Sequence, residues 1–364
     1  MAKRILVAVT NDVSTDNRVD KTCAYLLEKG YEVVVYGRVL PDTLQVTKAY
    51  DIIRVKHVFN ANFLFYAEFN ARLLWFIVKG NFDVILSNDL DTLPACYFGS
   101  ELKNTDLVYD SHELFSEGPE LKGRHFVTWF WRALERHFLP KLKKAYTVSD
   151  SIAEFYHNAY GTTMGVVRNM PHLLERSANK SVAFPTENRV ILYQGVLNPG
   201  RGLKPMIKAL HYMPNIDLVI IGYGKVRRDL EMFVAAEKMT QRVHFLGRID
   251  RDILPNYTKI ATLGMVLEEP LGKSFEYALP NKLFDYIHAE LPIIAGNLPE
   301  IREIIKTYHV GVCVNNYDPK TIATTVLQLL QSPERILEIK ANQTLAKAQL
   351  CWEIEQKKLD NYFD

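Results

Sequence analysis

The hydrophobic positions of the chain fall into short, almost continuous runs, and each run is followed by a stretch whose apolar residues have helical spacing. Such runs, rich in Val and Ile, are typical of strands in parallel sheets that helices cover on both faces. In the first half of the chain the expected strands are residues 4–10, 31–38, 52–58, 83–89, 107–111, 145–150 and 164–169. In the second half they are residues 190–195, 217–224, 243–248, 262–267, 291–296 and 310–315.

A polar segment flanked by prolines, residues 170–188, separates the two series and shows no clear period. Two series of alternating strands and helices predict an α/β chain with two doubly wound, Rossmann-like domains, which we place at residues 1–172 and 186–349. In such a sheet, ligands bind beyond the carboxyl ends of the strands. Two domains that presented these edges to each other would enclose a cleft with one substrate on each wall.

The composition limits the possible functions. The 364 residues suffice for two domains, and the net charge of +2 gives no field for nucleic acid, for which no binding motif is present either. The four cysteines lie far apart with no histidine at ligand spacing, so we expect reduced thiols and no metal site. No signal peptide precedes the first strand, and no apolar run reaches the roughly 20 residues that span a bilayer, which predicts a cytoplasmic protein.

Residues 190–210, VILYQGVLNPGRGLKPMIKAL, combine a strand, a loop with three glycines and a helix. Gly195, Gly200 and Gly202 let the backbone approach a ligand, and the start of the helix favours an anion there. Arg201 adds a planar guanidinium that matches phosphate oxygens, and Pro205 fits a first helical turn. The loop therefore predicts a phosphate site, although a tight structural turn explains the same glycines equally well.

A second strand–glycine–helix junction, VIIGYGKVRRDLE, contains Gly222 and Gly224. It places Lys225, Arg227 and Arg228 just inside the expected helix, where cations oppose the helix dipole. A nearby anionic ligand would account for them, and so would an ordinary solvated charge run.

The stretch ALPNKLFDYIHAELPIIAG, residues 278–296, starts a helix at Pro280 or Asn281. Lys282 then lies in the first turn and Asp285 one turn further on. A carboxylate there can accept hydrogen bonds from ribose hydroxyls, and the lysine and Asn281 can contact phosphate or base. A dipole partner for Asp285 and a surface position for Lys282 are the structural alternatives.

In the first domain, acids and a histidine follow two strands, in ILSNDLDTLPA and LVYDSHEL. His112 lies immediately beyond a strand end, where site residues are found. Paired acids also permit glycoside hydrolysis, but they could equally hold sugar hydroxyls or cap helices. The candidates for contacts to the acceptor or the sugar are Asp16, Arg18, Asp89, Asp91, Glu113 and, from the second domain, Glu276.

Together these stretches resemble a retaining GT-B glycosyltransferase of family 4 over essentially the whole chain. The second domain of that family opens with G-R-x-x-P-x-K-G, where this chain has GVLNPGRG, and its E-x7-E motif and GLPVVA correspond to YALPNKLFDYIHAELPIIA. The stretches VYDSHEL, TVSDSIAEFY, VVRNMP and CWEIEQKKLDNYF match in the same order. By this resemblance we expect a helix of about residues 350–364 to pack back on the first domain.

The resemblance implies that a UDP- or GDP-linked sugar binds the second domain, with its diphosphate near residues 195–202. Arg201 takes the place of the family lysine on the phosphates, Asp285 that of the ribose-binding glutamate, and His112 that of the histidine near the transferred sugar. The residues that fall where the nucleobase packs are Gly247, Arg248 and Ile249. Family members need no metal or cofactor, because cationic side chains and helix dipoles stabilise the leaving diphosphate.

Two positions depart from the family pattern. The arginine that follows the first glycine of the loop is Val196 here, and Lys282 is the candidate to replace its charge. The first glutamate of E-x7-E falls on Tyr277, with Glu276 one residue earlier. Donor binding in this chain is therefore expected either to differ from the family or to be weakened.

Residues 125–144 predict a helix that combines aromatic side chains, such as Phe126 and Trp129, with a basic end of Lys141, Lys143 and Lys144. This pattern fits a peripheral contact with an anionic membrane, at its inner face, and fits a packed amphipathic helix equally well.

We therefore expect a cytoplasmic glycosyltransferase that moves a sugar, with retention, to a glycan or lipid-linked acceptor in cell-surface polysaccharide or glycolipid synthesis. Arg201 and Lys282 would neutralise the diphosphate, and His112 would orient the sugar. A nucleotide-sugar epimerase of the same fold, a non-catalytic nucleotide-sugar-binding subunit and a glycosidase remain as alternatives. The glycosidase would use two of Asp89, Asp91, Asp110 and Glu113.

Overall fold

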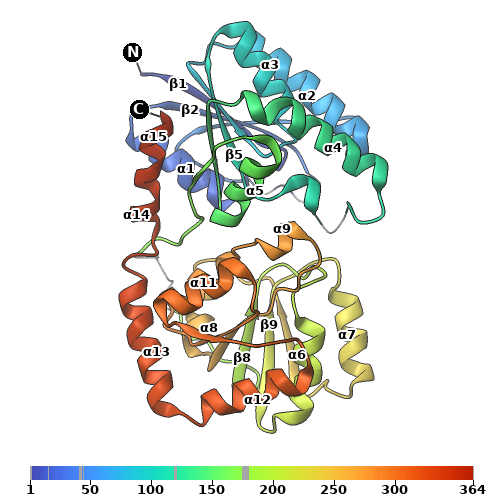
Figure 1. The fold of residues 1–364 in the computed structure, drawn as a ribbon, viewed down its shortest axis with the longest axis vertical. Helices are drawn as coiled ribbons and strands as arrows, with labels where there is room; N and C mark the ends of the chain where they lie inside the picture. Colours follow the sequence, from blue (N-terminus) through green and yellow to red (C-terminus); the bar gives the residue numbers. More distant parts are fainter. Residues whose placement is uncertain are drawn as a thin grey trace. The chain divides into compact units, whose positions relative to one another are not determined.

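The computed structural model describes residues 2–14, 16–40, 43, 45–118, 121–173 and 180–363 (Figure 1). The chain forms two compact units. Unit 1 is Met1–Asn169 with Gln356–Asp364, and unit 2 is Met170–Glu355. The division falls three residues before the boundary expected at 172, and unit 2 runs six residues past the expected end at 349. Residues 174–179 of the expected linker lie outside the described residues.

Unit 1 is built on a seven-stranded parallel sheet of order β3-β2-β1-β4-β5-β6-β7. All seven strands expected in the first half of the chain are present. Their bounds are β1 Arg4–Ala8, β2 Glu32–Arg38, β3 Asp51–Val55, β4 Val84–Asn88, β5 Asp106–Ser111, β6 Lys144–Thr147 and β7 Gly165–Val166. In the register, Leu6 of β1 lies between Val34 of β2 and Ile85 of β4, and all three are buried.

Helices cover both faces of this sheet, as the unbroken apolar strands require. Figure 1 shows α2, α3 and α4 on one side and α1, α5 and α15 on the other. The first face is closed by a cluster in which Phe65, Phe69 and Leu73 of α2 pack on Leu6 and Tyr36 of the sheet. The helices are α1 Asn17–Glu28, α2 Asn62–Lys79, α3 Leu93–Lys103, α4 His125–Phe138, α5 Asp150–Tyr160 and α15 Asp360–Phe363, with 3-10 turns η1 Phe115–Glu117 and η3 Leu139–Lys141.

The helix expected over residues 125–144 is shorter than predicted. α4 ends at Phe138, because Pro140 has no N–H with which to continue it, and a 3-10 turn leads into β6 at Lys144. Lys141, Lys143 and Lys144 therefore do not lie on this helix, and Lys144 pairs with Asp106 at 3.2 Å. The prediction that this helix has a basic end is therefore wrong.

Unit 2 is built on a six-stranded parallel sheet of order β10-β9-β8-β11-β12-β13, with all six expected strands present. Their bounds are β8 Arg189–Gln194, β9 Ile216–Ile221, β10 Val243–Gly247, β11 Leu263–Val266, β12 Ile293–Ala295 and β13 Gly311–Cys313. The helices are α6 Leu203–Ala209, α7 Arg227–Ala236, α8 Leu254–Ile260, α9 Lys273–Glu276, α10 Asn281–His288, α11 Pro299–Tyr308, α12 Pro319–Leu330, α13 Pro333–Ala346 and α14 Trp352–Glu355, with the 3-10 turn η4 Leu210–Tyr212. Two buried clusters lie on the two faces of this sheet, one with α6, α7 and α12 and the other with α10 and α11.

The single C-terminal helix expected over residues 350–364 is divided into short pieces. α14 stays with unit 2, whereas η5 Gln356–Leu359 and α15 belong to unit 1. There Tyr25 donates its hydroxyl to Asp360 at 2.7 Å and its ring lies 6.4 Å from that of Phe363. Across the described part of the chain, no helix combines the length and the apolar character needed to cross a bilayer.

Candidate functional site

Three loops of unit 2, which follow β8, β9 and β10, pack on one another at the carboxyl edge of the sheet. The N–H of Gly195 donates to the carbonyl of Ile221, and that of Gly222 donates to the carbonyl of Gly247. A Cβ on Gly222 would lie 1.9 Å from the carbonyl oxygen of Gly195, and one on Gly224 would lie 2.4 Å from that of Leu197. These two glycines, expected to contact a ligand, are therefore required by the close approach of two loops.

The loop 195–202 also packs against the segment that follows β11. Gly202 has φ 65°, lies at the start of α6, and a Cβ on it would lie 2.2 Å from the carbonyl oxygen of Leu267. Its N–H donates to the carboxylate of Glu269 at 3.1 Å, and the N–H of Glu269 donates to the carbonyl of Gly200 at 2.8 Å. The glycines thus fix where Arg201 lies.

Arg201 and Lys282, the two expected phosphate ligands, converge on one carboxylate. Arg201 Nη1 lies 2.7 Å from Glu268 Oε2, and Lys282 Nζ lies 2.7 Å from Glu268 Oε1. The Glu268 side chain is fully buried, that of Lys282 is 7% exposed and that of Arg201 is 23% exposed. Burial raises the pKa of Glu268, but Lys282 and Arg201 outweigh it and hold this pKa below its usual value. The three groups carry a net charge of +1.

Glu268 is the residue that the sequence analysis missed. It lies two residues beyond the end of β11, and Asp89 lies one residue beyond the end of β4, so the rule that singled out Asp89 applies to it as well. The signal was hidden because Glu268 and Glu269 read as an ordinary acidic pair before a proline.

Lys282, the candidate to replace the arginine that the family has in place of Val196, lies close to the end of β8. Its ammonium lies 4.1 Å from the centre of the Tyr193 ring, and a Cβ on Gly195 would lie 3.9 Å from Nζ. Tyr193 in turn donates its hydroxyl to the carbonyl of Val196 at 2.8 Å, while the Val196 side chain is 57% exposed. A cation thus lies beside the strand end where the resembled family has an arginine, but below the surface.

Asp285 lies in α10 beside the end of β8. Gln194 donates its side-chain amide to Asp285 Oδ2 at 2.8 Å and accepts a hydrogen bond from Thr258 at 2.8 Å. Gln194 is buried, so it fixes the orientation of the partly exposed carboxylate. Asn281 is the first residue of α10 and is exposed. The helix start predicted at Pro280 or Asn281 is confirmed, with Pro280 at the N-cap.

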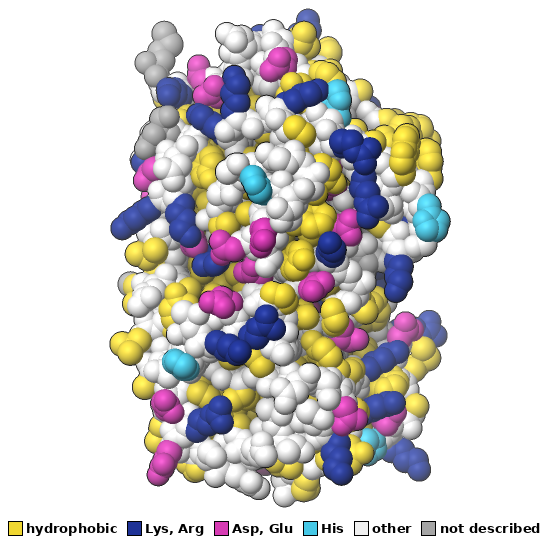
Figure 2. Space-filling view, viewed as in Figure 1, with side chains coloured by type: hydrophobic (Ala, Val, Ile, Leu, Met, Phe, Trp, Pro, Cys, Tyr) yellow, Lys and Arg dark blue, Asp and Glu magenta, His cyan; other side chains and the backbone are white. Residues whose placement is uncertain are grey.

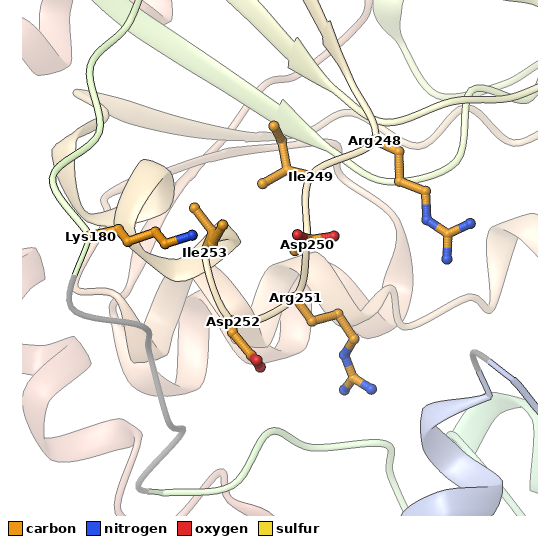
Figure 3. A pocket seen from close by; sticks show the side chains of 7 residues that line it. All are labelled: Lys180, Arg248, Ile249, Asp250, Arg251, Asp252 and Ile253. Carbon is orange, nitrogen blue, oxygen red and sulfur yellow. The ribbon is translucent and has the colours of Figure 1, made fainter. Parts of the chain in front are cut away.

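The loop after β10 lines a pocket of about 420 Å³ (Figure 3). Ile249 and Ile253 lie near its centre, and Lys180 reaches in from the opposite segment. Arg248 and Arg251 project away from Lys180, on the other side of the loop. Arg248 and Ile249, expected near the nucleobase, are thus both on a concave part of unit 2.

The charges at the second glycine junction need no ligand to explain them. Lys225 precedes α7 and does not lie inside it, which corrects the expectation. Arg227 pairs with Glu231 one turn further along the same helix at 2.9 Å. The solvated charge run is the better interpretation.

In unit 1, His112 lies between two carboxylates beyond the end of β5. Its Nδ1 is 3.1 Å from Asp89 and its Nε2 is 3.3 Å from Asp110, and its backbone N–H donates to Asp89 at 2.8 Å. Burial lowers the pKa of His112, but Asp89 and Asp110 outweigh it and raise this pKa well above the usual value. The two carboxylates therefore favour the imidazolium form of His112, whose side chain is 23% exposed.

Arg18 and Asp110 form the buried base of this cluster. Arg18 Nε and Nη2 donate to the two oxygens of Asp110 at 2.8 and 2.6 Å, and Nη1 donates to the carbonyl of Val167 at 2.9 Å. Asp110 is fully buried and Arg18 is 5% exposed. The expectation that Arg18 contacts an acceptor is therefore wrong, because its guanidinium holds Asp110 in place below the surface.

The remaining acids of unit 1 are arranged separately. Asp16 caps α1, accepting from the N–H of Val19 at 3.1 Å. Asp91 is 7% exposed and accepts from Thr10 at 2.6 Å, and burial together with Asp89 raises its pKa to about 7. Glu113 is exposed.

These placements bear on the glycosidase alternative, which needs two accessible carboxyl groups. Asp110 and Asp91 are both buried, and the Asp89 side chain is 24% exposed. Burial thus removes two of the four candidate carboxyl groups and leaves Asp89 and the exposed Glu113 for such a reaction. In unit 2, Glu276 is the last residue of α9 and is partly exposed.

Comparisons with known proteins agree with this architecture. The family model described as Glycosyltransferase Family 4 matches residues 16–170, and that described as Glycosyl transferases group 1 matches residues 175–346. An uncharacterized glycosyltransferase of Methanocaldococcus jannaschii is 27% identical over 156 residues, which are 42% of this chain and 38% of that relative. The matched part is thus well under half of the relative's length.

Solved structures match the whole chain at low identity. Sucrose-phosphate synthase from Thermosynechococcus elongatus has a TM-score of 0.82 at 16% identity, covering 99% of this chain and 98% of that one. HepE from Anabaena in complex with UDP has a TM-score of 0.74 at 14% identity, with coverages of 99% and 98%. A putative UDP-N-acetylglucosamine 2-epimerase from Listeria monocytogenes has a lower TM-score of 0.65 at 12% identity, with coverages of 99% and 95%.

The two parallel-sheet units therefore have the GT-B fold, as expected from the sequence. The chain belongs to the group 1, family 4-like glycosyltransferases.

Proposed function

We propose that the protein transfers a sugar, with retention of anomeric configuration, from a nucleoside diphosphate to a glycan or lipid-linked acceptor. The observation that carries this proposal is the pair of cations, Arg201 and Lys282, fixed at the carboxyl edge of unit 2 beside the loop 195–202. In doubly wound sheets this edge binds the ligand, and Arg and Lys are phosphate binders. The net charge of +1 on their cluster favours an anionic ligand.

Each further group has a part in this proposal. Asp285, oriented by Gln194, accepts hydrogen bonds from the ribose hydroxyls, and the base packs near Arg248 and Ile249. His112, held between Asp89 and Asp110, acts on the transferred sugar. The leaving diphosphate takes the acceptor's proton, so no protein base is required. Its charge is stabilised by the two side-chain cations without a metal ion.

A thermal-shift screen over UDP, GDP and their sugar conjugates tests the donor. A ligand that binds only the folded state at 100 times its dissociation constant stabilises it by about 2.7 kcal/mol, which is readily measured. We expect one nucleoside diphosphate to raise the midpoint and Arg201→Ala and Lys282→Ala to abolish the response. The matched control is Lys347→Ala, which removes a lysine paired with Glu290 in the same unit, away from the sheet edge. No response of the wild-type protein to any nucleotide contradicts the proposal.

Product analysis then separates transfer from the alternatives that share the donor site. Appearance of a glycosylated acceptor with the donor's anomeric configuration supports retaining transfer. Conversion of the donor sugar without an acceptor would identify an epimerase, and binding without any release of nucleoside diphosphate would identify a non-catalytic subunit. The family models, both of transferases, favour the first outcome.

The aromatic surface of unit 1 supports an acceptor at a membrane. Phe126 and Trp129 of α4 are 74% and 61% exposed and stack on each other, and Phe63 of α2 is 61% exposed. Figure 2 shows hydrophobic side chains gathered over the first turns of these helices. We propose that this surface contacts anionic lipid at the inner face of the membrane. Phe126→Ser with Trp129→Ser should abolish sedimentation with phosphatidylglycerol vesicles, and retention of binding by this variant would contradict the contact.

A further inference from the structure

Glu268 has features that donor binding alone does not require. It is fully buried, so no ligand reaches it, yet its two oxygens hold cations from two different elements. Arg201 comes from the β8–α6 loop and Lys282 from the first turn of α10. The Glu268 backbone is fixed as well, because its carbonyl accepts a hydrogen bond from the hydroxyl of Tyr317.

Each cation also lies close to an aromatic ring. The guanidinium of Arg201 lies 4.8 Å from the centre of the Phe275 ring, and Lys282 lies 4.1 Å from that of Tyr193. Each charge therefore contacts both a carboxylate and a ring before any donor arrives. Long side chains that are not confined in this way lose rotamer entropy when they bind a ligand.

We propose that Glu268 is a positioning residue for glycosyl transfer, which sets the place of both diphosphate-binding cations and keeps their net charge at +1. This inference rests on the proposed donor site. Two like charges held by the two oxygens of one carboxylate lie close together, and without that carboxylate they repel each other in a desolvated environment. Each cation would then settle where its own surroundings allow.

The effect belongs to the chemical step more than to binding. Cations that stabilise a leaving diphosphate contribute through their preorganised positions, and a displacement of about 1 Å can cost roughly 100-fold in rate. The diphosphate of the bound donor, in contrast, is attracted by the same two cations and repelled by the carboxylate. Removal of the negative charge should therefore leave ground-state affinity unchanged or increase it.

The test compares Glu268→Gln, which keeps the shape without the charge, with Glu268→Asp, which keeps the charge on a shorter stem. Binding of UDP and GDP is measured by calorimetry, and turnover by the release of nucleoside diphosphate from UDP-glucose, UDP-N-acetylglucosamine and GDP-mannose. We expect Glu268→Gln to lower kcat about 10- to 100-fold while the dissociation constant of the diphosphate stays equal or falls. Glu268→Asp should recover part of kcat.

The matched control is Asp217→Asn in the same unit. Asp217 is also a buried acid with two basic residues beside it, Arg242 at 3.5 Å and His244 at 3.1 Å, but it lies at the amino-terminal end of β9, the end opposite the carboxyl edge of the sheet. This variant should lose thermal stability and keep kcat. An unchanged kcat in Glu268→Gln would overturn the inference, as would parallel losses of kcat and affinity that merely follow a lowered melting temperature, as in Asp217→Asn.

Failure of the inference is distinguishable from failure of the proposed function. Wild-type protein that binds and turns over a donor, together with an unaffected Glu268→Gln variant, overturns only the role of Glu268. Wild-type protein that binds neither UDP nor GDP overturns the donor site and the inference together.

Discussion

The buried pair of Arg18 and Asp110 makes a quantitative prediction for unit 1. Burial raises the pKa of Asp110, but Arg18 and His112 lower it to about 2, against 3.8 for an ordinary aspartate. A lowering of this size corresponds to roughly 2 kcal/mol of stability from the ionised carboxylate. Asp110→Asn also leaves the Arg18 guanidinium buried without its counter-charge, and loss of one partner of a buried pair costs about 3–5 kcal/mol. We expect Asp110→Asn to destabilise unit 1 by about 3 kcal/mol at pH 7.

Urea unfolding followed by tryptophan fluorescence suits this measurement, because Trp75, Trp129 and Trp131 lie in unit 1 and Trp352 is in unit 2. The matched control is Asp106→Asn, at the other end of the same strand, where the carboxylate is 66% exposed and pairs with Lys144. An exposed ion pair contributes under about 1 kcal/mol, so the unfolding free energy of this variant should stay close to that of the wild type.

The pH dependence of the same measurement has a defined sign. A carboxylate whose pKa is lowered in the folded state stabilises it above its unfolded pKa, and this stability is lost as the pH falls from about 4 towards 2. The difference in the free energy of unfolding between the wild type and Asp110→Asn should therefore become smaller as the pH falls over this range. Equal losses of unfolding free energy in Asp110→Asn and Asp106→Asn at pH 7 would refute this prediction.

Two further predictions concern the neighbours of this pair. Burial and Asp89 raise the pKa of Asp91 to about 7, so ionisation of Asp91 lowers the stability of the folded state as the pH rises from about 4 to 7. Asp91→Asn should therefore raise the melting temperature at pH 8 and leave it unchanged at pH 4. Equal shifts of the melting temperature at both pH values would contradict this prediction. The raised pKa of His112 means that its charge stabilises the folded state below its unfolded pKa and that this stability is lost as the pH rises through the folded pKa. Its ring resonances in NMR should report an imidazolium at pH 7.5, and Asp89→Asn should lower the pKa; a neutral ring in the wild type would rule this out.

The strands could be read from the sequence because their signal is local. Each run of apolar residues carries its own pattern, and the parallel sheets follow from the helices between them. The residue at which α4 ends was also predictable from the sequence, because Pro140 lies inside the expected helix. The error there came from giving more weight to the aromatic and basic composition than to the proline.

Ion pairs between residues that are far apart in the sequence have no local pattern that would predict them. Arg18 and Asp110 are 92 positions apart, and Arg201 and Glu268 are 67 positions apart. Arg18 lies in α1, which follows β1, and the pairing of β1 with β4 and of β4 with β5 brings Asp110 to it. Whether a charged residue binds a ligand or another residue depends on what is buried opposite it, and one sequence does not contain that information.

Val196 provides a direct test of how this chain replaces the family arginine. Its side chain is 57% exposed, and its backbone carbonyl accepts hydrogen bonds from the Tyr193 hydroxyl and the Asn198 N–H, so Val196→Arg should be accommodated. An added exposed cation gains about 0.5–1 kcal/mol against a phosphate, which predicts about 2- to 5-fold tighter binding of UDP or GDP at low salt. Val196→Gln is the matched control for the longer side chain.

If Lys282 supplies the missing charge, Val196→Arg should help Lys282→Ala more than it helps the wild type, because the two cations would serve the same phosphate. The four proteins of this double-mutant cycle, titrated with UDP and GDP by calorimetry, measure that coupling directly. Additive effects would show that the two positions act on different parts of the ligand. In that case Lys282 is not the replacement, and its pairing with Glu268 serves the fold of unit 2.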